Sequence, residues 1–421
     1  MSARMAAAPT GASSLPWEVF ICRACGLLYD ESKGDEDGGL PPDTRFADIP
    51  VGWARPLCGV GKADFEPYLM EAQQALPRPA ALARTASGAR GARDDAGTVI
   101  VGAGRTGWQM AQALRGQDAD MPITIATACN GDVYDKPLLS VALARGISPQ
   151  MLPREAGVNA ARRLKVRLLA QTHAVRVSAG SRQLRTSRGT LRYQQLVLAH
   201  GAEARQLPQF PPALCWRINH LQAYARFRAA VAGAPQRIVV VGAGLIGSEL
   251  ANDLALVGHR VTLLDIAARP LAAVLGEAAS QQLIDAWKTL PIVFAGHTSV
   301  KSVALLPGGK KQISTEGGIV YRADQVVLAA GLQAPNRLAQ SAGLAWANGI
   351  AVDAGTLATS VAGIYALGDC ISIAGEVSRH IEPIGQQART LAARILGHES
   401  RPSLQTRVPL RIKTTSLPLT V

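Results

Sequence analysis

Two glycine-rich turns, each between an apolar strand and a helical pattern, most restrict how this chain of 421 residues can fold. One follows the run TVIV and the other follows RIVVV. The glycines of a G-x-G-x-x-G turn let the backbone approach a pyrophosphate at a helix N-terminus, where unpaired N–H groups favour anions. The pair predicts an α/β fold with two Rossmann-like dinucleotide-binding domains. The glycines are Gly102, Gly104 and Gly107 in the first turn, and Gly242, Gly244 and Gly247 in the second.

The residue that ends the next strand of each unit indicates its nucleotide. After the second turn, RVTLLDI places Asp265 at the end of a strand. A carboxylate there accepts hydrogen bonds from a ribose 2′-OH and repels a 2′-phosphate, which favours NADH. Arg260 and Arg269 flank it and leave NADPH as the less favoured alternative. The first unit has no equivalent acid, and its Cys129 is expected to be a small buried residue.

Three of the six cysteines are grouped near the N-terminus and point to a metal site. They are Cys22, Cys25 and Cys58, and the segment around them has few aliphatic residues. Such a segment needs a metal or an aromatic core to fold. Five aromatic residues could supply that core: Phe20, Tyr29, Phe46, Trp53 and Phe65.

This N-terminal segment resembles rubredoxin in C-x-x-C-G-x-x-Y-D, TRFADIPVGW and CGVGKADFEPY. In that family four cysteine thiolates hold one iron, but here Arg55 occupies the fourth ligand position. Arginine stays protonated and has no lone pair for a cation. Two alternatives remain open. A three-cysteine site completed by Asp48, Asp64 or water could hold iron or zinc, or the module is metal-free.

Charge divides the chain unevenly. Residues 17 to 68 contain ten acids and five bases, a net charge of −5. Because the whole chain carries a net charge of +13, the other residues together carry +18. An acidic module before a basic body favours docking of one on the other. The Ala/Arg/Pro/Gly-rich stretch at 70–97 is predicted to be a linker.

The basic residues of the chain do not alternate with aromatic residues, so the sequence predicts no nucleic-acid binding. No signal peptide or long apolar run is found, which predicts a cytoplasmic protein without membrane insertion.

The sequence from 98 to 421 resembles the FAD-dependent rubredoxin reductases. The matches are VYDKPLLS, GAGLIGSELANDL, NHLQAYARFR and VPLRIKTTSLPL. The run GIYALGDC resembles the late FAD fingerprint of flavoproteins with two dinucleotide-binding domains. The resemblance implies an FAD domain at 98–212, an NAD domain at 213–333, and the second part of the FAD domain at 334–421. A rubredoxin-like metal-ribbon domain at 17–69 precedes them.

The same resemblance implies the site residues. Lys136 and Glu249 lie beside the isoalloxazine as an ion pair, in which the lysine stabilises the reduced flavin and the carboxylate orients the lysine. Asp369 hydrogen-bonds the ribityl chain. Further FAD contacts match Pro137, Ile381 and Lys413. The alternative is that Glu249 lies on a helix surface and Lys136 makes a surface ion pair.

The expected function is electron transfer from NADH through FAD to a rubredoxin, either this module or a separate protein. The downstream partners that the resemblance implies are a monooxygenase or an oxygen- or nitric-oxide-reducing flavoprotein. Two other hypotheses stay open: a weak dinucleotide-binding protein with a metal-free docking module, and an NADH oxidase-like flavoprotein. In the family an interface domain follows PLRIKT, whereas this sequence stops at Val421, so we expect a more open flavin face.

Overall fold

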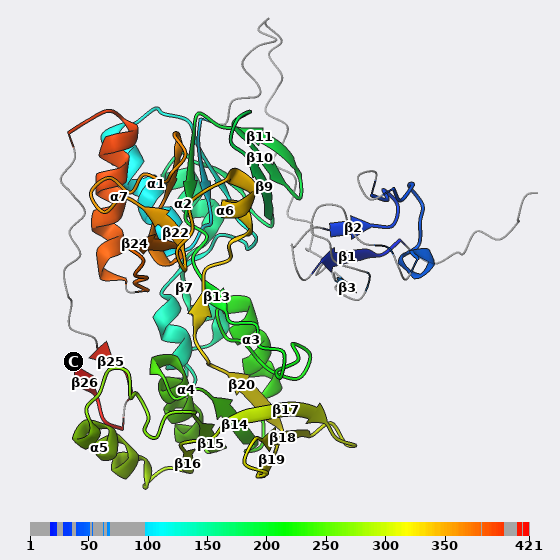
Figure 1. Cartoon of the computed structure of the whole chain (residues 1–421), viewed down its shortest axis with the longest axis vertical. Helices are drawn as coiled ribbons and strands as arrows, with labels where there is room; N and C mark the ends of the chain where they lie inside the picture. Colours follow the sequence, from blue (N-terminus) through cyan, green and yellow to red (C-terminus); the bar gives the residue numbers. More distant parts are fainter. Residues whose placement is uncertain are drawn as a thin grey trace, which may run out of the picture. The chain divides into compact units, whose positions relative to one another are not determined.

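The computed structural model describes residues 17–22, 28–35, 39–50, 53, 62, 65–67, 97–379, 381–399, 411–414 and 416–420 (Figure 1). The chain divides into two compact units. One comprises Met1–Asp94 with Arg185–Thr190, and the other comprises Asp95–Leu184 with Leu191–Val421.

The N-terminal unit contains a small antiparallel sheet in the order β2-β1-β3. Its strands are β1 (Val19–Cys22), β2 (Leu28–Asp30) and β3 (Phe65–Pro67), and a 3-10 turn, η2, spans Phe46–Asp48. The rings of Phe20 and Phe46 stack with centroids 3.9 Å apart. The expected aromatic core is confirmed, because the buried cluster comprises Phe20, Tyr29, Leu40, Ile49 and Phe65, with Phe46 and Trp53 packed against it.

Glu31 joins three parts of this unit. Its carboxylate accepts hydrogen bonds from the backbone N–H groups of Glu18 and Phe46 and from the guanidinium of Arg45. Burial raises the pKa of the Glu31 carboxyl, but these three donors outweigh burial and the net shift is downward.

The larger unit is built on two parallel sheets, and the first has the order β23-β12-β4-β5-β8. The runs TVIV and ITIA are completely buried, as expected for parallel strands covered on both faces. Helices α1 and α7 lie side by side against this sheet (Figure 1). The elements are β4 (Thr98–Val101), α1 (Arg105–Gln117), β5 (Ile123–Ala126), β8 (Arg167–Leu169), β12 (Gln195–Leu198), β23 (Ile364–Ala366) and α7 (Glu382–Ile395).

Further short elements lie between these strands and helices in the sequence. A three-stranded antiparallel sheet has the order β11-β10-β9, and β22 pairs with β24 in parallel. The bounds are β6 (Val133–Tyr134), η4 (Lys136–Ser140), η5 (Pro149–Met151), β7 (Pro153–Glu155), α2 (Gly157–Arg163), β9 (Ala174–Ser178), β10 (Gln183–Thr186), β11 (Gly189–Arg192), α6 (Arg337–Ala342), β22 (Ile350–Val352), η6 (Gly368–Cys370) and β24 (Ile371–Ile373).

The second parallel sheet has the order β16-β15-β14-β20, and an antiparallel sheet β17-β18-β19 accompanies it. Trp287 of α5 is among the largest fully buried side chains and belongs to the core of this half. The elements are α3 (Leu221–Ala230), β14 (Arg237–Val241), α4 (Leu245–Leu256), β15 (Arg260–Leu264), α5 (Glu277–Trp287), β16 (Ile292–Ala295), β17 (Val300–Leu305), β18 (Lys311–Thr315), β19 (Val320–Ala323) and β20 (Gln325–Leu328).

The chain passes between the two halves through one antiparallel strand pair, β13 (Glu203–Ala204) with β21 (Leu332–Gln333). The last two strands, β25 (Arg411–Ile412) and β26 (Leu419–Thr420), pair antiparallel. Ile412 is fully buried in the core of the second half. In the described part of the chain, every helix is too short or too polar to cross a bilayer.

Candidate functional site

The first glycine-rich turn connects β4 to α1 and has no room for side chains on its inner side. Gly102 has φ of +108°, and a Cβ there would lie 2.5 Å from the carbonyl oxygen of Ala199. A Cβ on Gly107 would lie 1.9 Å from the carbonyl oxygen of Gly102. Gly104 caps α1, and a Cβ there would meet nothing within 4 Å. The turn is therefore closed toward the sheet and open at the helix N-terminus, as a phosphate cradle requires.

The second turn repeats this geometry between β14 and α4. Gly242 has φ of +102° and packs against the carbonyl of Ala329, while a Cβ on Gly247 would lie 1.8 Å from the carbonyl oxygen of Gly242. Gly244 caps α4 and again faces open space. Two turns with the same open helix N-terminus fit two dinucleotides.

Asp265 follows β15 and is bonded to this second turn. Its Oδ2 accepts the backbone N–H of Ala243 at 2.5 Å, and its Oδ1 accepts that of Ala267 at 2.7 Å. The carboxylate thus fixes the turn that would hold the pyrophosphate. Each carboxylate oxygen keeps a further lone pair for a ligand hydroxyl.

Lys136 begins η4, is exposed to solvent, and lies near two other titratable groups. Desolvation by the surrounding protein lowers the pKa of its ammonium group, and the negative charge of Asp369 opposes that shift. Burial also lowers the pKa of His220, followed by the positive charges of Arg226 and Lys136. The structure therefore brings together Lys136 and Asp369, two residues that lie 233 positions apart in the sequence (369 − 136).

Glu249 does not form the ion pair with Lys136 that the sequence suggested. Its Oε2 accepts the hydroxyl of Ser140 at 2.5 Å, and its Oε1 accepts the backbone N–H of Lys413 at 3.0 Å. Glu249 is only 4% exposed, so the alternative of a helix-surface residue is also wrong. A buried carboxylate needs hydrogen-bond donors to compensate for lost solvation, and for Glu249 these donors come from η4 and the C-terminal segment.

Of the remaining FAD residues suggested by the resemblance, Pro137 and Lys413 are bonded to each other. Pro137 is in the first turn of η4, and its carbonyl accepts the ammonium group of Lys413 at 3.2 Å. Ile381 precedes α7 as its N-cap residue and is half-buried.

Sequence reasoning missed several residues that hold these segments. Gln387 of α7 is 6% exposed, and its side-chain oxygen accepts the N–H of Gly368 at 3.0 Å, which fixes the turn of Asp369. Asp253 of α4 accepts two backbone N–H groups from the loop after η4. The available signal was a set of polar residues spaced three and four apart in an otherwise apolar helix.

The metal ligands expected from the sequence are largely outside the described residues. Cys25, Arg55 and Cys58 lie there, and Cys22 is the last residue of β1. Within the described ranges no group of three or more His, Cys, Asp or Glu could hold a metal. The three-cysteine site therefore stays a prediction.

Two of the other three cysteines lie in the core. Cys215 and Cys370 are buried, and burial raises their pKa values to about 11 and about 12. Cys129 is half-buried rather than buried, and its Sγ accepts the backbone N–H of Gly131 at 3.4 Å.

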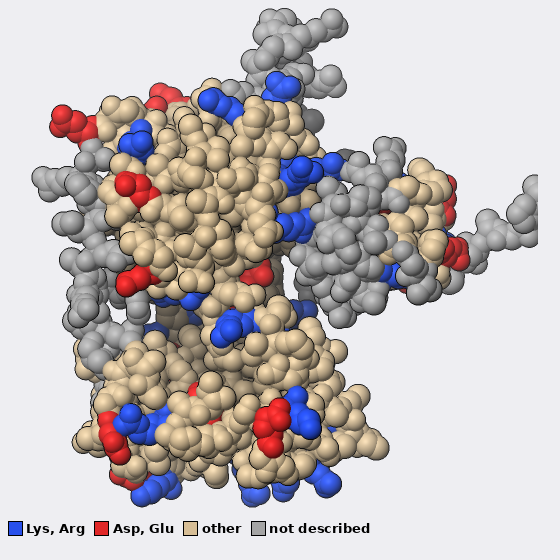
Figure 2. All heavy atoms as spheres, viewed as in Figure 1, with Lys and Arg blue, Asp and Glu red and all other residues tan. Residues whose placement is uncertain are grey.

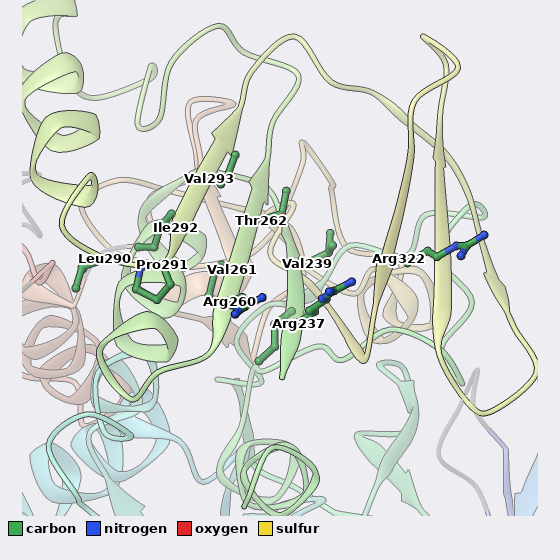
Figure 3. A pocket seen from close by; sticks show the side chains of 11 residues that line it. Arg237, Val239, Arg260, Val261, Thr262, Leu290, Pro291, Ile292, Val293 and Arg322 are labelled. Atoms are coloured by element: carbon green, nitrogen blue, oxygen red, sulfur yellow. The ribbon is translucent and has the colours of Figure 1, made fainter. Parts of the chain in front are cut away.

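A cavity of about 410 Å³ lies away from all of these residues (Figure 3). It opens on the amino ends of β14, β15 and β16, the opposite end of the sheet from the glycine turn. Arg237, Arg260 and Arg322 line it together with apolar residues. Of the residues that the sequence analysis placed near a dinucleotide, only Arg260 lines it.

The charges of the larger unit are dispersed on the face that Figure 2 shows. Lysine and arginine side chains form small separate groups, with acidic side chains between them.

Comparison with known proteins identifies both parts of the chain. Residues 97–391 match the family of pyridine nucleotide-disulphide oxidoreductases, and residues 19–65 match rubredoxin. Two curated relatives are named nitric oxide reductase FlRd-NAD(+) reductase. The relative from Aeromonas hydrophila is 35% identical over 322 residues, which are 76% of this chain and 82% of that protein. The relative from Escherichia coli (strain 55989 / EAEC) is 35% identical over 331 residues, with 77% and 85% covered.

Solved structures give the same fold. The covalent putidaredoxin reductase–putidaredoxin complex has a TM-score of 0.71 and 26% identity, covering 77% of this chain and 80% of that chain. The ferredoxin reductase for the CYP199A2 system from Rhodopseudomonas palustris has a TM-score of 0.66 and 28% identity, covering 73% and 78%. The predicted α/β class is confirmed. The chain belongs to the pyridine nucleotide-disulphide oxidoreductase family and is an oxidoreductase with a rubredoxin domain at its N-terminus.

Proposed function

We propose that this protein passes electrons from NADH through FAD to a rubredoxin-type one-electron carrier. The observation that carries the proposal is the pair of glycine-rich turns in one unit, each open at a helix N-terminus. The names of the relatives support it, since they describe reductases that couple NAD to a flavorubredoxin.

FAD fits the first turn, and the family implies both FAD and NAD(H). The backbone N–H groups at the start of α1 would hold the pyrophosphate, and Asp369 in its fixed turn would hold the ribityl chain. Bound flavin supplies a two-electron acceptor that can release electrons singly. The ammonium of Lys136, near Asp369, would provide a positive charge that favours the reduced, anionic form.

NADH is the proposed donor because Asp265, bonded to the second turn, would accept hydrogen bonds from the ribose hydroxyls. We expect Asp265→Asn to raise the KM for NADH about tenfold, since it weakens charge-assisted hydrogen bonds both to the turn and to the ribose. The variant should also lose preference for NADH over NADPH, because the charge that repels a 2′-phosphate is gone. Steady-state kinetics with both nucleotides measure this. An unchanged preference would show that Asp265 does not contact the ribose.

The acceptor is proposed to be a rubredoxin, either the N-terminal domain of this chain with iron in its three-cysteine site or a separate protein with four cysteines. A nitric-oxide or oxygen reductase, or a monooxygenase, would then consume the electrons. The relatives' names favour the nitric-oxide reductase. The use of NADH favours a cytoplasmic location.

The test is an anaerobic visible spectrum of the purified protein before and after NADH, with its flavin and metal content. We expect one FAD per chain, bleaching of the flavin band by NADH, and re-oxidation when an intact rubredoxin is added. Nucleotide binding without flavin would instead indicate a dinucleotide-binding protein. Equal NADH consumption in air with and without a carrier would indicate an oxidase.

A further inference from the structure

Helix α4 has a buried polar side that the proposed chemistry does not explain. Glu249, Asn252 and Asp253 are 4%, 2% and 3% exposed. Residues three and four apart lie on one side of a helix, so the three side chains face the same neighbours. Buried carboxylates persist only where strong hydrogen bonds compensate for lost solvation.

The partners of these side chains are the segment that carries Lys136 and the C-terminal segment. Asp253 Oδ2 accepts the backbone N–H of Leu143 at 3.0 Å, and Oδ1 accepts that of Ala144 at 2.9 Å. One helical turn earlier, Glu249 accepts the hydroxyl of Ser140 at 2.5 Å. The chain from 136 to 144 is thus bonded to α4 at two points, both after Lys136.

The other end of the same helix is the second dinucleotide turn, since Gly244 caps α4. A helix of 12 residues therefore joins the NADH cradle to the Lys136 segment without an intervening loop. We propose that Asp253 is a positioning residue, which clamps the Lys136 segment onto α4 and so fixes Lys136 relative to the bound nicotinamide nucleotide. This inference rests on the proposed function for the role of Lys136, but the clamp itself does not.

The charges around Asp253 fit this role. Arg228 of α3 donates to the carbonyl of Ile147 and to the hydroxyl of Tyr224, and it faces Asp253 together with Arg145. Burial raises the pKa of Asp253 to about 6, against the effect of the two backbone donors and both arginines. Above pH 7 the group is a carboxylate, so each of its oxygens accepts a charge-assisted bond.

The test compares Asp253→Asn with Asp285→Asn in the full-length, FAD-loaded protein at pH 8. Asp285 is an exposed acid on α5 that pairs with Lys288, so it controls for loss of one charge in the same half of the unit. Amide exchange of Leu143 and Ala144 should accelerate about tenfold or more in Asp253→Asn, because asparagine has only one acceptor oxygen. Exchange should be unchanged in Asp285→Asn.

A second readout separates positioning from general damage. In Asp253→Asn we expect the rate of flavin reduction at saturating NADH to fall about tenfold. The dissociation constant for NADH should stay within about twofold of the wild-type value. Wild-type exchange rates for the two amides, or an equal loss of NADH affinity, would overturn the proposal. If Asp253→Asn does not fold, the wild-type protein decides. Protection of the Leu143 and Ala144 amides from hydrogen exchange by less than about tenfold would overturn the proposal. If NADH reduces no flavin even in the wild type, the proposed function fails while amide exchange still tests the clamp.

Discussion

Gly104→Val is expected to abolish FAD binding while the chain still folds. A Cβ at Gly104 would meet nothing within 4 Å in the protein, and the residue has φ of −74° and ψ of −173°, which valine adopts readily. Its loss as a helix cap costs about 1 kcal/mol of folding free energy. The valine would, however, fill the open side of the phosphate cradle, so the dissociation constant for FAD should rise about 100-fold or more. Flavin fluorescence during titration of the apoprotein measures it.

Two matched variants make this result specific. Gly116 lies on the same helix, α1, and a Cβ there would also meet nothing within 4 Å, so Gly116→Val should bind FAD normally. Gly244→Val, at the equivalent place in the second turn, should retain FAD but lose reduction by NADH. Normal FAD binding by Gly104→Val would mean that the flavin does not use this turn.

Arg55→Cys is expected to change the N-terminal domain from iron-poor to a full iron site. The change supplies the fourth thiolate of the rubredoxin pattern, and thiolates suit tetrahedral iron. Iron should rise from less than about 0.2 to about one per chain, with the visible absorption of iron–thiolate bonds, because metal binding and folding of such domains are coupled. Metal analysis and absorption spectra of protein expressed with added iron measure this.

Arg55→Ala is the control, since it removes the positive charge without adding a thiolate. It should remain iron-poor. A result in which Arg55→Cys also takes up no iron would show that the domain lacks the site for reasons beyond that one ligand. A full iron content in the unaltered protein would show that three cysteines suffice.

The sequence was sufficient for features that short stretches of backbone determine. The glycine turns could be predicted because their positive φ angles and close approaches exclude every other residue, as at Gly102 and Gly242. The aromatic core of the N-terminal unit was also predictable, because few other apolar residues were present there to bury.

The partners of buried side chains could not be predicted in the same way. Glu249 was expected to pair with Lys136, yet it binds Ser140 and the backbone of Lys413. That choice depends on where η4 and the C-terminal segment pack against α4. The roles of Gln387 and Asp253 depend on contacts over 19 and about 110 residues, which no local pattern encodes.

The order of strands in the first sheet has a consequence for biosynthesis. β23 pairs with β12, although Ile364 follows Leu198 by 166 residues (364 − 198). The second sheet is formed from the chain between those strands, Arg237 to Leu328, and is complete before β23 has been made. At a synthesis rate of roughly 5–20 residues per second, about 10–30 seconds separate the synthesis of β12 from that of its edge partner β23. On the ribosome, the second sheet is therefore complete before the first gains its edge strand, while the core beside the second sheet gains Ile412 only at the end of synthesis.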